Sequence, residues 1–285
     1  MFDLYIGLAI LAMLSLLVFA LSAVLAGGHH WLGNGLAIGT VLLTFAYIRF
    51  VWDNTLLATV LPFSNLVVLG NWFPLAAGFL AGVVWRRIPA KRRLYPVLAL
   101  ILSAAYSAAY PLLGSPPKCR DTWLLNSICL QTTPATCTPA CAATLLKDKD
   151  IQASEAEMAR LCLTRKRGTN WMGLYRGLTL KTEGTDWTVN VVHGTAEELL
   201  AGLDGPVIIA VGLPFDEPPN SYYRTRWIWN PGEEHSVLLG PPDDKGLFPI
   251  VDPDPKVGFE KWTRKDVLKL WRGQGMLLAP RPGSR

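Results

Sequence analysis

One cysteine of this sequence, Cys137, has the surroundings that a nucleophile needs. A thiol attacks best as the thiolate, and both a helix N-terminus and a neighbouring histidine favour that form. Cys137 lies where the apolar pattern predicts the start of a helix that continues to about Lys147. This position is also common for a small buried residue or a disulfide partner. Cys141, one helical turn later, is the alternative nucleophile, although no free helix-end N–H groups lie beside it.

The base for such a thiol must come from elsewhere in the chain, because triad members meet in space rather than in sequence. Of the four histidines, His193 is expected in a solvated turn at a strand end. His235 opens a predicted strand, and Asp252 ends the next one, directly before Pro253. If the two strands are neighbours, Asp252 can reach the ring nitrogen of His235 that does not face the thiol. Taken singly, His235 is better interpreted as a polar hairpin residue and Asp252 as a turn former before proline.

The elements that must position these residues follow from periodicity and capping patterns. Helices are predicted first, over residues 137–147, over 155–163 after a Ser-x-x-Glu cap, and after Gly168-Thr169. A hairpin around Asn230-Pro231-Gly232 is expected to join two of the strands. Strands are predicted at 187–191, 206–211, 226–229, 235–239, 246–252 and 275–279, with short helices at 195–203 and 263–271. Helices followed by an antiparallel sheet indicate an α+β domain.

The chain before Gly114 has a different composition from the rest. Hydrophobic residues make up 51% of the sequence and charged residues only 17%, and most of the apolar excess precedes Gly114. A membrane-spanning helix needs about 20 mostly apolar residues. Four stretches meet this requirement: Tyr5–Ala26, Leu32–Trp52, about Val67–Trp85 and Leu94–Leu113. We therefore expect a membrane domain over residues 1–114, a linker or entry loop over 115–130 and a soluble domain over 131–285.

A basic run, Arg86-Arg87-Ile88-Pro89-Ala90-Lys91-Arg92-Arg93, separates the third and fourth of these stretches. Such a run can indicate nucleic-acid binding. Between two apolar spans it instead indicates a cytoplasmic loop, because positive charge stays on the cytoplasmic side of the membrane. The expected partner is thus the lipid bilayer and not nucleic acid. The chain is expected to be a multi-pass protein of the cell membrane, with residues after Ser115 on the extracytoplasmic side.

All five cysteines follow the last predicted span. An oxidising compartment permits disulfides, and we expect Cys119–Cys129 and Cys141–Cys162, which leaves Cys137 free. An inverted topology would instead give five reduced thiols. A zinc site is disfavoured, because there is no Cys-x-x-Cys pair and no histidine at ligand spacing. His29 and His30 are interpreted as part of an interfacial polar loop rather than as a metal pair. Neither a metal nor a cofactor is expected.

From Gln131 to about Leu278 the chain resembles the bacteriocin-processing cysteine peptidases that cleave double-glycine leaders, a family of papain-like fold. The stretch Gln131-Thr-Thr-Pro-Ala-Thr-Cys137 is similar to the family's glutamine, followed after about five residues by a cysteine at a helix start. Thr136 and Thr138 stand where family members usually have aspartate and glycine. The remaining similar segments follow in the family's order: Ser154–Cys162, Gly168-Thr169, Gly173-Leu174, His235–Gly240, Val251–Pro253, Gly258 and Trp271.

Together with the four apolar stretches, this resemblance predicts a multi-pass α-helical membrane segment followed by an α+β papain-like domain, and it implies that the domain cleaves peptides or proteins. Cys137 would attack the carbonyl, His235 would hold and transfer the proton, and Asp252 would orient His235. The Gln131 amide would stabilise the oxyanion together with the backbone N–H of Cys137. No Gly-Lys-Ser/Thr loop is present, so ATP is not an expected partner. Two alternatives stay open: a catalytically inactive, membrane-anchored peptide-binding module, and a structural membrane protein with a disulfide-stapled cap.

Overall fold

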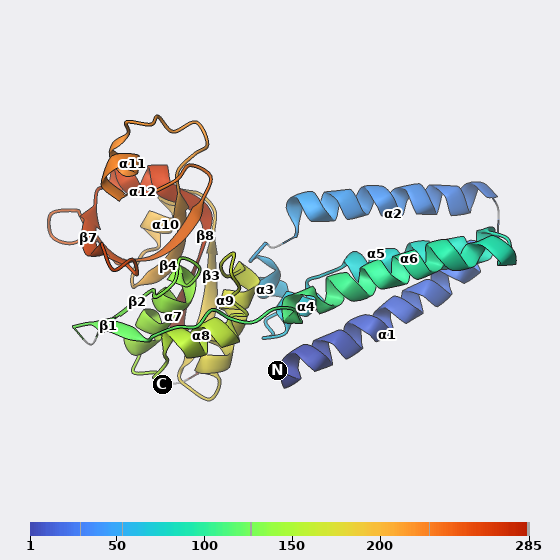
Figure 1. Cartoon of the computed structure of the whole chain (residues 1–285), viewed down its shortest axis with the longest axis horizontal. Helices are drawn as coiled ribbons and strands as arrows, with labels where there is room; N and C mark the ends of the chain where they lie inside the picture. The colour runs from blue at the N-terminus through green and yellow to red at the C-terminus, as the bar shows by residue number, and fades with distance from the viewer. Residues whose placement is uncertain (29, 53, 126, 228, 284–285) are drawn as a thin grey trace. The chain divides into compact units, whose positions relative to one another are not determined.

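The computed structural model describes residues 1–28, 30–52, 54–125, 127–227 and 229–283. The chain divides into two compact units. The first consists of Met1–Leu57 and Leu61–Leu113, and the second of Ala58–Val60 and Gly114–Arg285. The first unit is helical, whereas the second contains both helices and strands (Figure 1). His29 lies outside the described residues, and so the interpretation of His29 and His30 as a polar loop stays a prediction.

Long apolar helices make up the first unit. Among the described residues, four helical stretches are long and apolar enough to cross a membrane: Phe2–Leu25, Gly33–Phe50, Leu66–Arg87 and Ala90–Leu112. Each corresponds to one of the four spans expected from the sequence. The helices over residues 1–113 are α1 (Phe2–Leu25), α2 (His30–Phe50), α3 (Leu57–Val60, of which Ala58–Val60 belong to the second unit), α4 (Leu66–Leu69), α5 (Phe73–Arg87), α6 (Ala90–Ala109) and the 3₁₀ turn η1 (Tyr110–Leu112).

Two glycines let α5 pack directly against the backbone of α1. A Cβ atom at Gly82 would overlap the Phe19 carbonyl and the Ser22 hydroxyl, and one at Gly78 would lie 2.8 Å from the Ser15 carbonyl oxygen. Small residues commonly allow membrane helices to approach closely, because lipid tails provide no hydrophobic drive for association. The pairing of α1 with α5 therefore depends on the absence of side chains at these two positions.

The second unit is built on a six-stranded antiparallel sheet with the strand order β3-β8-β4-β5-β6-β7. Its central strand β4 is buried along its whole length. The strands are β3 (Trp187–His193), β4 (Val207–Gly212), β5 (Glu234–Leu239), β6 (Phe248–Asp252), β7 (Gly258–Trp262) and β8 (Trp271–Pro280). A separate two-stranded ribbon consists of β1 (Thr122–Leu124) and β2 (Ile128–Leu130).

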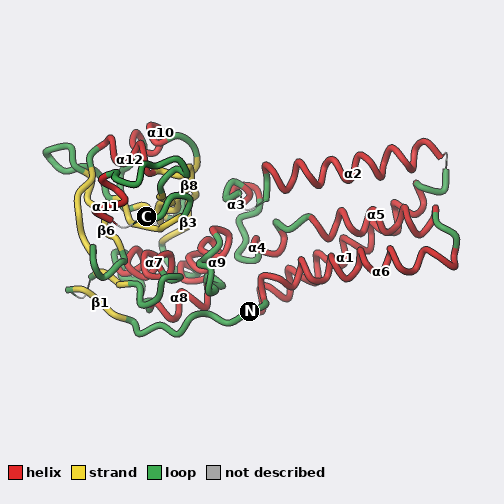
Figure 2. Tube along the Cα trace, turned by 45° about the horizontal axis from the view of Figure 1, so that its top comes forward, coloured by secondary structure: helices red, strands yellow, loops and turns green. Residues whose placement is uncertain are grey.

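Helices cover both faces of this sheet (Figure 2). The helices that precede it, α7 (Cys137–Lys147), α8 (Glu155–Leu161) and α9 (Trp171–Thr182), lie together, and α7 packs against β4 and β5. On the opposite face, alternate residues of β4 join the core formed with α10 (Ala196–Ala201) and α12 (Arg264–Leu270). The predicted α+β order, with helices first and an antiparallel sheet after them, is confirmed.

Local capping patterns predicted most of the helix starts correctly. The hydroxyl of Ser154 accepts the Glu157 N–H at the start of α8. Thr195 with Glu198 and Thr263 with Asp266 form complete capping boxes at α10 and α12. Each of these caps satisfies backbone N–H groups that have no partner within the helix.

The predicted hairpin between residues 226–229 and 235–239 is wrong. Residues Tyr222–Trp227 form the short helix α11, and the neighbours of β5 in the sheet are β4 and β6. The Thr225 hydroxyl donates to the Ser221 carbonyl oxygen, and the Tyr223 hydroxyl donates to Asp266 on α12 at 2.9 Å. These contacts fix the segment as a helical turn. Because β5 already has a partner on each side, it has no free edge for a further strand.

Candidate active site

Cys137 is the first residue of α7, and Thr136 is the N-cap. The buried Thr136 hydroxyl donates to the Thr133 carbonyl oxygen at 2.9 Å and accepts the Thr133 N–H at 3.1 Å. This turn fixes the chain immediately before the helix. Cys137 itself is half-buried. Its thiol therefore stands where the positive end of the helix dipole favours a thiolate, as the sequence predicted.

His235 and Asp252 come together because β5 and β6 are neighbours. The pairing of Leu238 with Val251 and of Leu239 with Ile250 sets the register that brings the start of β5 to the end of β6. The His235 Nε2 atom lies 2.8 Å from the Asp252 Oδ1 atom, and Asp252 is 1% exposed. Since Nε2 is engaged by the carboxylate, Nδ1 is the ring nitrogen left for the thiol. The predicted neighbourhood of these two strands is confirmed.

The pair formed by Cys137 and His235 favours a thiolate beside an imidazolium. Burial alone would raise the pKa of the Cys137 thiol, but the hydrogen bond and positive charge of His235 outweigh it and lower that pKa below its ordinary value of 9.0. Burial alone would lower the pKa of His235, whereas the hydrogen bond to Asp252 and the thiol raise it to about 10. Each partner thus stabilises the charged form of the other.

Cys141 has the opposite environment. Its side chain is 1% exposed, and its Sγ atom donates to the Ser236 carbonyl oxygen at 3.2 Å. Burial and the nearby Cys137 and Asp252 charges raise the pKa of this thiol well above its usual range. A buried thiol that stays protonated is a poor nucleophile. Of the two cysteines at the start of α7, the geometry thus favours Cys137.

The expected disulfides are wrong: in the part of the chain that the structure describes, all five cysteines are free thiols. Cys141 faces the backbone of β5, whereas Cys162 lies against Gly177 of α9, so these two thiols face different neighbours. In the β1–β2 ribbon, the residue opposite Cys129 is Trp123, and Cys119 precedes β1 in the chain.

The three remaining thiols are held in their protonated form. Burial raises the pKa of Cys119 to about 11, with a further contribution from the Glu155 and Asp121 carboxylates. The same causes, in the same order, raise the pKa of Cys129 to about 12. Burial also raises the pKa of Cys162 to about 12. Cys137 is therefore the cysteine of this chain whose pKa is lowered.

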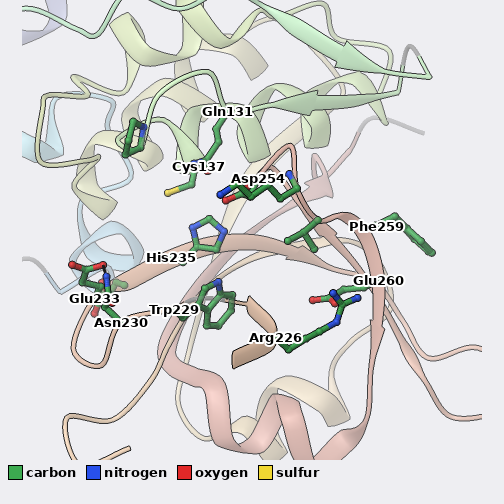
Figure 3. Close-up of a pocket in the computed structure, with 14 residues that line it drawn as sticks. Gln131, Cys137, Arg226, Trp229, Asn230, Glu233, His235, Asp254, Phe259 and Glu260 are labelled. Carbon is green, nitrogen blue, oxygen red and sulfur yellow. Dashed lines mark hydrogen bonds between the residues drawn. The ribbon is translucent and has the colours of Figure 1, made fainter. Parts of the chain in front are cut away.

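A cavity of about 550 Å³ lies beside Cys137 and His235. Figure 3 shows Gln131 and Cys137 on one side of it and the His235 ring facing them. Asp252 stands behind the ring and does not line the cavity. Ligand-binding pockets are typically about 300–1,000 Å³ in volume. The lining residues are Gln131, Pro134, Cys137, Arg226, Trp229, Asn230, Glu233, Glu234, His235, Asp254, Lys256, Val257, Phe259 and Glu260. The structure thus brings the four predicted site residues together, three on the cavity and one behind it.

A search of the solved structures finds similar proteins, whereas no protein-family model and no curated protein matches this sequence. The peptidase domain of Streptococcus ComA, a bi-functional ABC transporter involved in a quorum sensing pathway, is 20% identical, with a TM-score of 0.40, and the match covers 53% of this chain and 96% of that one. A double glycine motif protease from an AMS/PCAT transporter, solved in complex with the leader peptide, is 16% identical, with a TM-score of 0.40 and coverage of 59% and 95%. The peptidase domain of Streptococcus mutans ComA is 20% identical, with a TM-score of 0.36, and the match covers 54% of this chain and 99% of that one. These matches concern fold alone and cover between 53% and 59% of this chain.

Two features of the site were missed by sequence reasoning. The Trp229 ring contacts His235 edge to face, with ring centroids 5.5 Å apart, and lies 6.0 Å from Trp262. The Thr138 and Ser236 hydroxyls lie 2.8 Å apart and join α7 to β5 directly beside Cys137 and His235. Thr138 stands where the resemblance predicts glycine, and its partner is 98 residues away, so no local pattern could have indicated the contact.

Proposed function

We propose that this chain is a membrane-anchored cysteine peptidase with Cys137 as nucleophile. The observation that carries the proposal is the relay in which Asp252 holds His235 and His235 lowers the pKa of Cys137, beside a cavity of about 550 Å³. A half-buried thiol with a lowered pKa is suited to nucleophilic attack, whereas a structural cysteine needs no such arrangement. The substrate is a peptide or protein.

The chemistry follows from these positions. The Cys137 thiolate adds to the scissile carbonyl carbon, and the carbonyl oxygen becomes an oxyanion. His235 gives its Nδ1 proton to the leaving amine as the C–N bond breaks, which leaves a thioester on Cys137. Water then attacks the thioester while His235 takes its proton. The C–S bond breaks, the acid product leaves and the thiolate–imidazolium pair is restored. Neither a metal nor a cofactor takes part in these steps.

The oxyanion is proposed to lie between the Gln131 side-chain amide and the backbone N–H of Cys137. As the first helical residue, Cys137 has no carbonyl four positions earlier within the helix to accept its N–H. Gln131 lines the cavity on the same side (Figure 3). Donors preorganised where charge develops stabilise the transition state more than the ground state.

Replacement of the Gln131 side chain is expected to slow catalysis without changing the reactivity of the Cys137 thiol. Gln131→Ala should lower kcat about 10²-fold, the effect typical of one oxyanion donor. The rate at which iodoacetamide alkylates Cys137 should stay unchanged, because that reaction forms no oxyanion. Both rates are measured on the full chain, with a fluorogenic peptide amide ending in Gly-Gly, chosen for the sequence resemblance, as substrate. Gln152→Ala, at an exposed loop position, is the matched control. Equal kcat for the two variants would remove Gln131 from the mechanism.

We further propose that the four apolar helical stretches anchor the peptidase domain, residues 131–285, in the cell membrane, with residues 115–130 as the linker. The basic run over residues 86–93 supports a cytoplasmic loop and hence an extracytoplasmic peptidase domain. A thiol reagent that does not cross membranes is therefore expected to label Cys137 in intact cells that express the chain. Labelling that occurs only after the cells are opened would place the domain on the cytoplasmic side.

A further inference from the structure

A fully buried carboxylate, Glu155, lies outside the catalytic relay and is not required by the mechanism above. It is the first residue of α8 and is 0% exposed. Its Oε1 atom accepts the Thr132 N–H and its Oε2 atom accepts the Thr132 hydroxyl, each at 2.7 Å. Short hydrogen bonds to an ionised acceptor are about twice as strong as neutral ones. Both carboxylate oxygens are thus used on one residue, 23 positions earlier in the chain.

Thr132 directly follows the proposed oxyanion donor. The Gln131 N–H donates to the Pro253 carbonyl oxygen at 2.8 Å, and Pro253 directly follows Asp252. The Thr132 hydroxyl in addition accepts the Arg120 N–H at 3.1 Å. The backbone of these two residues is therefore held from two sides, by the end of β6 and by the start of α8.

The side chain of Gln131 has less support of its own. Its Oε1 atom is buried and has no hydrogen-bond partner among the described residues. The direction of the amide is therefore set mainly by where the backbone places it. A misplacement of about 1 Å by a distant change is enough to cost a large factor in rate, because reacting groups must be aligned closely.

We infer that Glu155 is a positioning residue for catalysis: through Thr132 it sets where the Gln131 amide lies relative to Cys137. The inference rests on the proposed function. It assigns to Glu155 an effect on turnover that a carboxylate serving only as a structural clip would not have. A buried charge is costly unless it is fully hydrogen-bonded, and here both of its oxygens hold the segment that carries the donor.

The test compares Glu155→Gln, which keeps the shape but gives one oxygen's place to an NH₂ group, with Thr132→Val, which removes only the hydroxyl. The control is Glu157→Gln on the same helix, whose carboxylate pairs with Lys181 at 3.0 Å. For the full chain, kcat and KM are measured with the Gly-Gly peptide amide, together with the rate at which iodoacetamide alkylates Cys137. Each variant is also combined with Gln131→Ala.

Glu155→Gln is expected to lower kcat about tenfold, with KM and the alkylation rate changed less than about twofold, because only the donor is displaced. Thr132→Val should show a smaller loss of the same kind, and the control none. Since Glu155 acts through Gln131, Glu155→Gln should cause no further loss in the Gln131→Ala background.

Two results would overturn the inference while leaving the peptidase intact. One is an unchanged kcat in Glu155→Gln, and the other is a loss that multiplies with that of Gln131→Ala. A reduced alkylation rate in both Glu155→Gln and Thr132→Val would point to general disruption of the site and would likewise contradict it. If iodoacetamide alkylates Cys137 of the unsubstituted chain but that chain cleaves no peptide, the proposed function itself is wrong. The positioning role of Glu155 in catalysis is then wrong as well.

Discussion

Cys137→Ala is expected to abolish peptide hydrolysis, with a loss in kcat/KM of at least about 10⁴-fold, as for the removal of other covalent nucleophiles. The thiolate of Cys137 forms the bond that replaces the scissile C–N bond, and no other cysteine thiol of this chain has a lowered pKa. The measurement is cleavage of the Gly-Gly peptide amide by the purified full chain. The alanine variant should still bind the peptide, because the cavity and its other lining residues are unchanged.

The matched control is Cys141→Ala, one turn along the same helix. Its thiol donates to the Ser236 carbonyl oxygen, and the protein should lose some stability but retain activity within a few-fold. If Cys141→Ala is inactive and Cys137→Ala is active, the assignment of the nucleophile is reversed. If neither the unmodified chain nor its variants cleave peptide although all of them bind it, the chain is an inactive peptide-binding module.

The second large effect is expected at Asp252. Asp252→Ala removes the acceptor for His235 Nε2 and also the acceptor for the Asp254 N–H, which lies 2.8 Å from Oδ1. The hydrogen bond to Asp252 is the first of the interactions that raise the pKa of His235 to about 10. Without it the pKa of His235 falls, the imidazolium is lost at neutral pH and the Cys137 thiolate loses its counterion. We expect a loss in kcat/KM of about 10³- to 10⁴-fold at pH 7.

The pH dependence of kcat/KM tests the same relay. In the unmodified chain the thiolate forms as the pH rises through a pKa below 9.0, and the imidazolium is lost as the pH rises through about 10. The profile of kcat/KM should therefore be bell-shaped, with its alkaline limb near pH 10. In Asp252→Ala the alkaline limb moves to lower pH and the acid limb moves to higher pH, so the pH range of activity narrows. Asp252→Asn keeps a hydrogen-bond acceptor without the charge, and both of its limbs should lie between those of the unmodified chain and those of Asp252→Ala. Unchanged limbs in both variants would contradict the relay.

The positions of Cys137, His235 and Asp252 could be predicted because each depends on a local pattern. A helix start is visible in the sequence around Cys137, and the apolar residues within 235–239 and 246–252 indicate two strands that are close in the chain. Short-range pairing of consecutive strands then brings His235 to Asp252. The four apolar helical stretches are visible for the same reason, since length and composition define them.

The features that could not be predicted depend on contacts between distant segments. The alternating aromatic residues before Asn230 suggest a strand, but β5 is already paired on both sides, and Tyr223 is tied to Asp266 on α12. The capping pattern at Ser154 predicts the hydrogen bond from the Glu157 N–H to the Ser154 hydroxyl. It gives no reason to expect that Glu155 accepts hydrogen bonds from Thr132. The disulfides were inferred from the number and compartment of the cysteines. Neither property contains the distances that decide whether two thiols meet.

The most direct test of the account is mass spectrometry of the purified full chain after treatment with iodoacetamide at pH 7, without prior reduction. One rapid modification is expected, at Cys137. The other four thiols should react far more slowly, because burial raises their pKa values. His235→Ala should remove the selectivity. If Cys137 is instead found in a disulfide, or is unreactive while Cys119 is modified, Cys137 is not an activated nucleophile and the peptidase account is wrong.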